Sequence, residues 1–295
     1  MIIQIAGVTF LIHVPGPLIL KNPNPFYTAF VQSGIYSEAS DIDVSLDFDN
    51  MPGTKNLSKI FDGGESWSMW QNSDHYFVTL HSPASDGQLL WAAKFNSSAK
   101  KVTVYPGDTP AEKTSDSAEV FNPFSYPLDQ ILLMYFLAQR EGALFHAAGI
   151  DINGKGYIFP GKSGAGKTTL SRQFVAKNHQ GLLSDDRIVI RKNDARFMAY
   201  GTPWPGEGKI AVNKSVPLNG IFFIIHGRSN RIEEIKPANA FEKLLPVVSV
   251  PWYDKEIMLK IISFCEDLTS RIPAYTLHFK PDTEMVEYFE KFVSI

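Results

Sequence analysis

The most informative segment of this chain reads Gly161-Lys162-Ser163-Gly164-Ala165-Gly166-Lys167-Thr168. It fits the pattern G-x-x-x-x-G-K-[ST] without a mismatch, which is typical of loops that bind phosphate groups. The glycines allow backbone N–H groups to turn inward and approach phosphate oxygens closely. In such loops the lysine, here Lys167, reaches the β- and γ-phosphates, and the threonine hydroxyl, here of Thr168, can bind Mg²⁺. The residues that we expect to bind a nucleotide are Gly161, Lys162, Ser163, Gly164, Ala165, Gly166, Lys167, Thr168 and Thr169.

The residues on both sides of this segment support the same prediction. Residues 156–160 have the composition of a short buried strand, and residues 168–176 carry apolar side chains at helical spacing, at Leu170, Phe174 and Val175. A strand, a glycine loop and a helix are the context that the motif requires, because the helix directs its first N–H groups and its dipole at the anion. The alternative, a glycine-rich turn that matches by chance, does not predict these flanks.

The chain has 295 residues, which is enough for two domains. We expect a mixed α/β protein with a β-rich N-terminal domain over residues 1–110, a linker over 111–126 and a second domain over 127–295. Residues 1–12 indicate a strand, and residues 41–49 alternate polar and apolar side chains as a half-exposed strand does. The remaining strands predicted in this domain are 67–70, 76–80, 89–95 and 102–105.

Further elements are predicted between these strands and the glycine loop. Residues 106–119 are rich in Pro, Gly, Ser, Thr and Asp and indicate a linker or exposed loop, and residues 127–138 indicate an apolar helix that ends at Gly142. Asn153-Gly154 predicts a hairpin turn into the strand that precedes the loop. Trp67, Trp70 and Trp91 fit a core or sheet face better than a ligand cage.

The composition argues against several partners. The net charge is −3, and no run of five like charges occurs, whereas nucleic acids and anionic membranes favour concentrated Lys and Arg. No apolar stretch approaches the roughly 20 residues that span a bilayer, and the N-terminus lacks the features of a signal peptide. The single cysteine, Cys265, fits a buried position in a helix and is compatible with a reducing compartment. We therefore expect a cytoplasmic protein without nucleic-acid or membrane partners, and homo-oligomerisation stays open.

Two adjacent carboxylates follow the loop closely. Asp185 and Asp186 begin 18 residues after Lys167, which leaves room for one helix, one turn and one short strand. The loop and the pair are then expected at the same edge of a sheet, where α/β folds bind ligands. Phosphoryl transfer needs one carboxylate to hold Mg²⁺ and another to accept the proton of the attacking hydroxyl. A helix cap or a solvated turn is the other interpretation of the pair.

Three further positions are candidates for the site. The segment 201–209 surrounds one tryptophan with prolines and glycines, and both Glu207 and Lys209 could face a ligand from it, although a plain surface turn is the alternative. His146 lies in an apolar strand expected to pair with the strand before the loop. It could approach the γ-phosphate or could be a satisfied core histidine. Lys162 could add positive charge near the phosphates or be solvated.

Three segments carry a family resemblance: Phe145-His146-Ala147-Ala148-Gly149, the glycine loop continued by Thr168-Thr169-Leu170, and Leu183-Ser184-Asp185-Asp186. Together they resemble the HPr serine kinase/phosphorylase family and, more distantly, ATP-dependent phosphoenolpyruvate carboxykinase. Ordinary P-loop NTPases usually place the second acidic motif much further along the chain. The resemblance covers residues 143 to about 225. It implies a carboxykinase-like P-loop kinase domain with a mixed β-sheet, the use of ATP and Mg²⁺, and phosphorylation of a hydroxyl.

The resemblance also implies roles for individual residues. Asp185 and Asp186 would supply the metal contact and the general base, and His146 would line the site. The nearest counterpart of the family's glutamate-arginine-glycine signature is Glu207-Gly208-Lys209, which lacks the arginine, so phosphorolysis of phosphoserine is not predicted. Residues 1–110 show no evident match to the family's N-terminal domain, which puts HPr in doubt as the acceptor.

The prediction that results is an ATP- and Mg²⁺-dependent phosphotransferase. It would act on a serine-type hydroxyl of a protein, peptide or small molecule, with catalytic residues Lys167, Asp185, Asp186, Glu207 and His146 and metal ligands Thr168, Asp185 and Asp186. Two alternatives stay open. One is a nucleotide-binding regulatory module that phosphorylates no acceptor, and the other is a simple NTPase whose acceptor is water.

Overall fold

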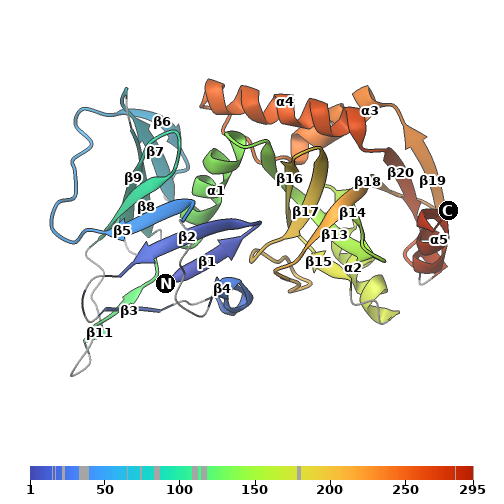
Figure 1. The fold of residues 1–295 in the computed structure, drawn as a ribbon, viewed down its shortest axis with the longest axis horizontal. Helices are drawn as coiled ribbons and strands as arrows, with labels where there is room; N and C mark the ends of the chain where they lie inside the picture. Colours follow the sequence, from blue (N-terminus) through green and yellow to red (C-terminus); the bar gives the residue numbers. More distant parts are fainter. Residues whose placement is uncertain are drawn as a thin grey trace. The chain divides into compact units, whose positions relative to one another are not determined.

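Two units make up the chain, residues 1–139 with 252–255 and residues 140–251 with 256–295. The computed structural model describes residues 1–14, 16, 18–21, 24–32, 40–64, 66–73, 75–82, 87–107, 112–113, 118–177, 181–282 and 284–294. Each unit has β-strands and helices of its own (Figure 1). The boundary between units lies after the helix predicted at 127–138, and the predicted domain limits at 110 and 126 stay predictions.

The first unit is built on a nine-stranded sheet in the order β4-β1-β2-β5-β10-β9-β8-β7-β6. Its strands are β1 (Ile2–Ile5), β2 (Val8–His13), β4 (Val31–Gln32), β5 (Ile42–Leu46), β6 (Ser58–Asp62), β7 (Trp67–Gln71), β8 (Tyr76–Ser82), β9 (Gln88–Phe95) and β10 (Lys101–Pro106). A second, three-stranded sheet joins β3 (Leu18–Lys21), β11 (Glu112–Lys113) and β12 (Ala118–Phe121). The 3₁₀ helix η1 (Pro25–Phe30) and helix α1 (Leu128–Ala138) complete the unit.

Buried carboxylates bind tyrosine hydroxyls in the core of this unit. Asp129 of α1 is fully buried and accepts a hydrogen bond from Tyr27. Asp254, from the short segment 252–255, accepts hydrogen bonds from Tyr76 at 2.5 Å and Tyr135 at 3.0 Å. A buried carboxylate requires such donors, because its desolvation would otherwise be costly. Segment 252–255 is therefore a part of the first unit's core although it lies far along the sequence.

Three details differ from the sequence prediction. The N-terminal segment forms two strands, because Ala6 and Gly7 have positive φ angles (54° and 69°) and turn the chain back. Gly142 does not end a helix; α1 ends at Ala138, and Gly142 begins the next strand. The predicted loop 106–119 contains β11 and the start of β12, and its residues 108–111 and 114–117 lie outside the described residues.

The second unit holds an eight-stranded mixed sheet. Two of its strands, β13 and β18, are long enough to pair with different partners along their two halves. Its strands are β13 (Gly142–Ile152), β14 (Lys155–Pro160), β15 (Leu182–Ser184), β16 (Arg187–Asn193), β17 (Arg196–Gly201), β18 (Ser215–His226), β19 (Arg231–Ile235) and β20 (Ala274–Phe279). The first half of β13 pairs with β16, and its second half pairs with β14 and β15. Likewise β18 pairs first with β17 and then with β14 and β20. The Asn153-Gly154 turn joins β13 to β14 as predicted, with φ angles of 54° and 80°.

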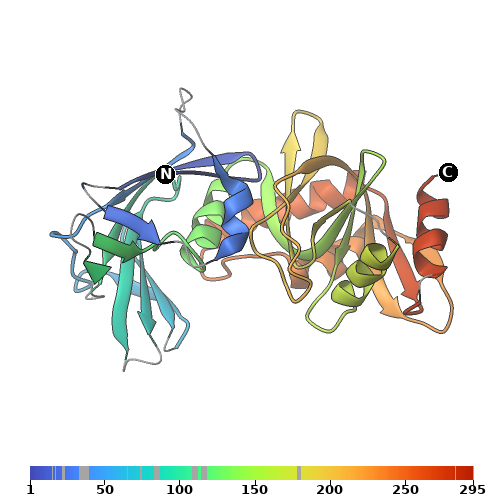
Figure 2. The same ribbon diagram turned by 90° about the horizontal axis from the view of Figure 1, so that it is seen from below.

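Helices cover both sides of this sheet (Figures 1 and 2). Helices α2 (Lys167–Ala176) and α5 (Glu284–Val293) pack on one side, where Phe174 and Phe289 meet Phe159 and Phe222 of the strands. Helix α4 (Lys255–Arg271) lies on the other side, with Phe264 against Phe197 of β17. In the part of this unit that the structure describes, the remaining helices are α3 (Pro237–Leu244) and the 3₁₀ helix η3 (Leu245–Val247).

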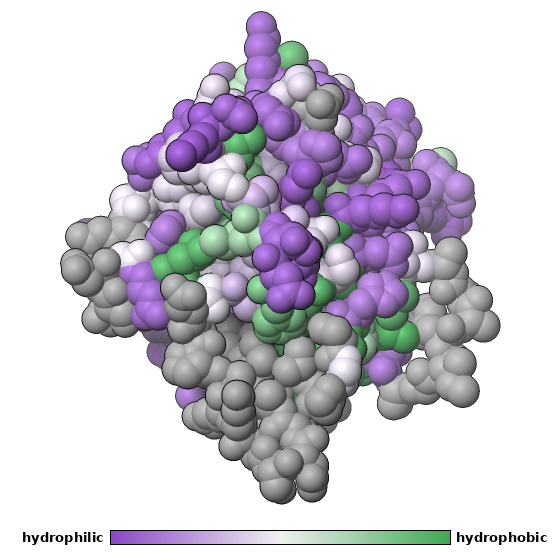
Figure 3. Space-filling view, turned by 90° about the vertical axis from the view of Figure 1, so that its left-hand side faces the viewer, coloured by the Kyte–Doolittle hydropathy of each residue, from purple (hydrophilic) through white to green (hydrophobic). Residues whose placement is uncertain are grey.

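One side chain that was predicted to face the core is exposed in the structure. Val175, which the helical spacing placed on the apolar face of α2, is 53% exposed. On the described part of the face in Figure 3, hydrophilic residues predominate and apolar residues form small scattered areas. None of the helices in the described residues is both long and apolar enough to cross a membrane.

Candidate active site

The glycine loop (residues 161–166) connects the end of β14 to the first turn of α2, as the sequence predicted. Gly164 and Gly166 have φ angles of 82° and 102°, a region that side chains with a Cβ rarely adopt. A Cβ on Gly161 would lie 2.7 Å from the Cβ of Ala165, so this position also requires glycine. The loop conformation therefore depends on all three glycines.

The start of α2 leaves backbone donors open to a ligand. Gly166 is the N-cap residue, and no side chain among the described residues caps the helix there. The first N–H groups of a helix have no partner within the helix, and its dipole makes this end positive. Gly166 also lies close to the end of β18, the parallel neighbour of β14, since a Cβ on it would be 3.5 Å from the side chains of both Ile224 and His226 of that strand. The structure therefore places a helix terminus with the geometry of an anion site beside the carboxyl ends of these parallel strands.

Lys167 is buried beneath the loop. Its side chain is 5% exposed, and Nζ donates hydrogen bonds to the carbonyl oxygens of Gly161 at 2.7 Å and Lys162 at 3.1 Å. Burial lowers the pKa of Lys167, and the nearby carboxylate of Asp186 partly opposes this effect. The ammonium group is thus held at the centre of the loop by neutral carbonyl groups, which an anion could replace as partners.

Asp186 and His146 form a pair at the other side of the pocket. His146 Nε2 lies 2.8 Å from Asp186 Oδ1, and Arg187 Nε lies 3.4 Å from Asp186 Oδ2. Burial raises the pKa of Asp186, but the hydrogen bond and charge of His146, with the charges of Arg187 and Lys167, outweigh it. The pKa of Asp186 therefore lies below its ordinary value, and the side chain is a carboxylate at neutral pH.

Asp185 points in a different direction from its neighbour. It is 1% exposed, and its two oxygens accept hydrogen bonds from the backbone N–H groups of Gly206, Gly208 and Ile210 at 3.0, 2.6 and 3.2 Å. The structure thus separates the acidic pair: Asp186 lines the pocket, whereas Asp185 is occupied by the 201–210 loop. Adjacent side chains at a strand end diverge in this way because successive residues face opposite sides.

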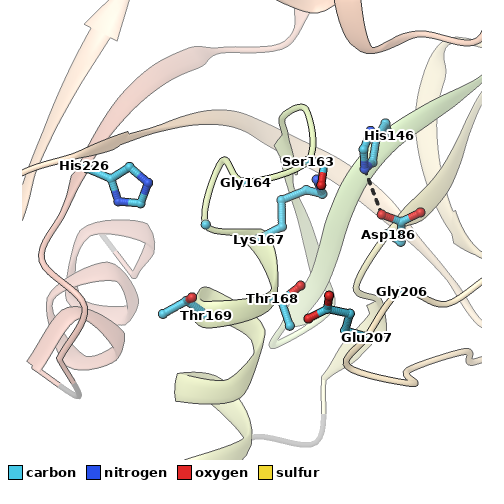
Figure 4. A pocket seen from close by; sticks show the side chains of 11 residues that line it. His146, Ser163, Gly164, Lys167, Thr168, Thr169, Asp186, Gly206, Glu207 and His226 are labelled. Carbon is cyan, nitrogen blue, oxygen red and sulfur yellow. Dashed lines mark ion pairs between the residues drawn. The ribbon is translucent and has the colours of Figure 1, made fainter.

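The pocket itself has a volume of about 460 Å³. Its lining includes the following predicted residues: His146, Ser163, Gly164, Gly166, Lys167, Thr168, Thr169, Asp186 and Glu207. Figure 4 shows Glu207 beside Thr168, with Asp186 and His146 near Lys167. Segments far apart in the sequence therefore form one pocket, which contains both a lysine ammonium group and carboxylates.

Some predicted residues do not line the pocket. They are Gly161, Lys162, Ala165 and Asp185, and the side chain of Lys162 is exposed to solvent. Lys209 is also exposed and does not line the pocket, although it was a candidate beside Glu207.

Two residues that line the pocket, Gly206 and His226, were not among those predicted from the sequence. His226 was detectable in principle, since it ends the apolar run 221–225 and β18 is parallel to β14. The ends of parallel strands meet at one edge of a sheet, where ligands bind.

The donor atoms in the pocket fit a hard divalent cation. Mg²⁺ in phosphoryl-transfer sites is bound by a hydroxyl, one or two carboxylates and phosphate oxygens. The Thr168 hydroxyl and the carboxylates of Asp186 and Glu207 supply such oxygens around one cavity. Among the described residues, no three His, Cys, Asp or Glu side chains gather closely enough to hold a metal alone.

These features define a mixed α/β protein with a charged pocket at the start of a helix. Residues 128–294 match the family model described as ScmC, SynChlorMet cassette protein ScmC, and the chain belongs to this family. No curated protein shows significant similarity to the chain.

Among solved structures, the HPr(Ser) kinase/phosphatase from Coxiella burnetii is similar over 51% of this chain and 88% of its own length. The sequence identity is 15% and the TM-score is 0.30, which is a distant likeness.

Proposed function

We propose that this protein is an ATP- and Mg²⁺-dependent kinase that transfers the γ-phosphate to a serine-type hydroxyl of a protein, peptide or small molecule. One observation carries the proposal: a single pocket combines the glycine loop, Lys167, Thr168, the Asp186–His146 pair and Glu207. Phosphoryl transfer depends mainly on positioning and on stabilising charge, and each of these groups serves one of those two needs.

The phosphate donor would bind at the loop and the first turn of α2. The open N–H groups of the helix terminus would donate hydrogen bonds to the phosphate oxygens, and Lys167 Nζ would exchange the carbonyl oxygens of Gly161 and Lys162 for phosphate oxygens. Because Lys167 is nearly fully buried, its charge acts with little screening by water. Thr169 and His226 extend the lining beyond the loop, on the side away from Asp186 (Figure 4).

Thr168 and Glu207 would hold Mg²⁺, which neutralises charge on the phosphate oxygens when it is bound, and the carboxylate of Asp186 is left to accept a proton. These two side chains come from the start of α2 and from the 201–210 loop. Their common feature is an oxygen that faces the pocket. Asp185, which the sequence also offered as a metal ligand, is assigned no contact with the metal here.

Asp186 would take the proton of the acceptor. Its carboxylate is ionised at neutral pH, and His146 fixes its orientation through the 2.8 Å contact. In the transfer, the acceptor oxygen forms a new P–O bond as the bond between the γ-phosphorus and the bridging oxygen breaks. The proton of the hydroxyl passes to Asp186, and ADP leaves with the bridging oxygen.

The test is incubation of the protein with γ-labelled ATP, Mg²⁺ and a lysate, followed by mass-spectrometric identification of the labelled species. We expect a phosphorylated serine-type hydroxyl, and no label with Lys167→Ala. Phosphate release without a labelled acceptor would instead identify an NTPase. Nucleotide binding without either product would identify a regulatory module.

A further inference from the structure

The carboxylate of Asp185 holds the turn that carries Glu207. We propose that Asp185 is a positioning residue, which fixes Glu207 in the pocket by binding the backbone on both sides of it. The inference rests on the proposed function for the role of Glu207, but the contacts that support it are independent of that role. It also differs from the sequence-based assignment, which made Asp185 a metal ligand.

Three backbone groups converge on this side chain. Gly206 N–H and Ile210 N–H donate to Asp185 Oδ1, and Gly208 N–H donates to Oδ2. Hydrogen bonds to a carboxylate are about twice as strong as neutral ones. Both oxygens of a side chain that is 1% exposed are thus occupied by one short loop.

The glycines of the loop are explained by this contact. A Cβ on Gly208 would lie 2.6 Å from Asp185 Oδ2, and a Cβ on Gly206 would lie 3.0 Å from the same atom. Real Cβ atoms essentially never come as close as the first distance. Gly206 and Gly208 therefore allow the backbone to approach the carboxylate of Asp185. We call these hydrogen bonds between Asp185 and residues 206–210 the anchor, and the two glycines are required by it.

The anchor encloses one residue. Glu207 stands between the two anchored glycines, and Lys209 N–H donates to the Gly206 carbonyl oxygen at 3.1 Å, which closes the turn. Lys209 itself has a φ angle of 55°. The turn directs Glu207 toward Thr168 (Figure 4). A long, exposed side chain on a free loop would lose conformational entropy on binding a ligand, and a fixed backbone reduces that loss.

The base of the loop is held as well, so the effect of Asp185 is confined to its tip. Thr202 is fully buried and donates to the Arg187 carbonyl oxygen at 2.7 Å. Gly201 N–H donates to the Lys214 carbonyl oxygen at 3.0 Å. Loss of the Asp185 contacts should therefore release residues 206–210 while the rest of the loop stays in place.

The anchor is tested by cleavage with a lysine-specific protease, because Lys209 is exposed within the turn. We expect Asp185→Asn to increase cleavage after Lys209 about tenfold, since its amide N–H group cannot accept the backbone hydrogen bonds that Oδ2 or Oδ1 accepts. The matched control is the adjacent Asp186→Asn, which should leave the cleavage rate unchanged. If Asp185→Asn does not fold, Gly208→Ala disturbs the same contact from the other side and should have the same effect. Unchanged cleavage in a folded Asp185→Asn or Gly208→Ala protein overturns the anchor.

The effect on Glu207 is tested by measuring Mn²⁺ binding in the presence of ATP, with electron paramagnetic resonance as the readout. We expect Asp185→Asn and Glu207→Gln each to weaken Mn²⁺ binding by about 10–100-fold. The double variant should bind Mn²⁺ about as tightly as the single variant that shows the larger loss of affinity. Multiplied effects in the double variant would show that Asp185 acts separately from Glu207 and would overturn the proposal. If Mn²⁺ and ATP do not bind to the wild-type protein, the proposed function fails, and the cleavage of Lys209 still decides whether Asp185 holds the turn.

Discussion

His146 Nε2 and Asp186 Oδ1 lie 2.8 Å apart, at the side of the pocket that faces Lys167. The contact both orients the carboxylate and lowers its pKa against the opposing effect of burial. An ionised, oriented carboxylate is what a proton acceptor in phosphoryl transfer requires. This pair therefore gives the most direct tests of the site.

Asp186→Asn should abolish most of the transfer activity. The amide keeps the size of the side chain but accepts no proton, so we expect a rate loss of about 10²–10⁴. ATP affinity should change less than the rate, because in the proposed complex the phosphates contact the loop and Lys167. Asp43→Asn is the matched control, since it alters a His–Asp pair far from the glycine loop in sequence, with His13 at 3.6 Å. Equal rates in the wild type and Asp186→Asn would refute the role of Asp186.

His146→Ala should raise the pKa of Asp186. The imidazole supplies the leading effects that lower this pKa, so burial is less opposed without it. An unfolded Asp titrates at about pH 3.9, and the folded pKa is lower. The wild-type pair therefore adds stability above about pH 4, which is lost as the pH falls through the folded pKa. Carboxyl ¹³C NMR titration of the two proteins measures the shift, and His278→Ala, which removes a histidine 3.0 Å from Glu233, should leave Asp186 unchanged.

Gly166→Ala should destabilise the fold through backbone strain alone. Its φ angle is 102°, whereas an added Cβ would meet its nearest atoms at an ordinary distance of 3.5 Å. We expect a loss of about 1–3 kcal/mol in the free energy of unfolding, measured by urea denaturation. Gly53→Ala is the control, because nothing in the described structure lies within 4 Å of a Cβ there and its φ is not positive. Similar losses in the two variants would contradict the strain argument.

Cys265 should react with iodoacetamide only after unfolding. Its thiol is fully buried, and burial raises its pKa to about 12. The thiolate is the reactive form, so native protein at about pH 8 should label far more slowly than protein in concentrated guanidinium chloride. Since the folded state keeps the proton to a higher pH than the unfolded state, this group makes stability fall as the pH rises between about 8.5 and 12. Rapid labelling of the native protein would show that α4 opens readily or that Cys265 is accessible.

Much of the second unit could be predicted because its signals are local. The Asn153-Gly154 turn, the glycine loop and the spacing of Leu170 and Phe174 each follow from a few adjacent residues. The prediction for Val175 was wrong because helical spacing identifies a broad apolar stripe but not which residues lie at its exposed edge. Gly142 was misinterpreted because a glycine after a helix is compatible with either an end of that helix or the start of a strand.

The divided roles of Asp185 and Asp186 could not be predicted from their types or spacing. Which of the two faces the pocket depends on the 201–210 loop, whose amides occupy Asp185 and which lies about 20 residues further along. His226 was missed for a related reason. Its position depends on the parallel pairing of β14 with β18, a contact between segments far apart in the sequence.

Asp254 has a practical consequence for expression of the two halves of this protein. The chain passes from the second unit into the first at residue 252 and returns after 255, so no single cut yields both units intact. A fragment that stops at residue 139 would lack the Asp254 carboxylate, which accepts hydrogen bonds from the buried hydroxyls of Tyr76 and Tyr135. An N-terminal fragment should therefore be expressed with residues 252–255 fused to it, or with both tyrosines replaced by phenylalanine.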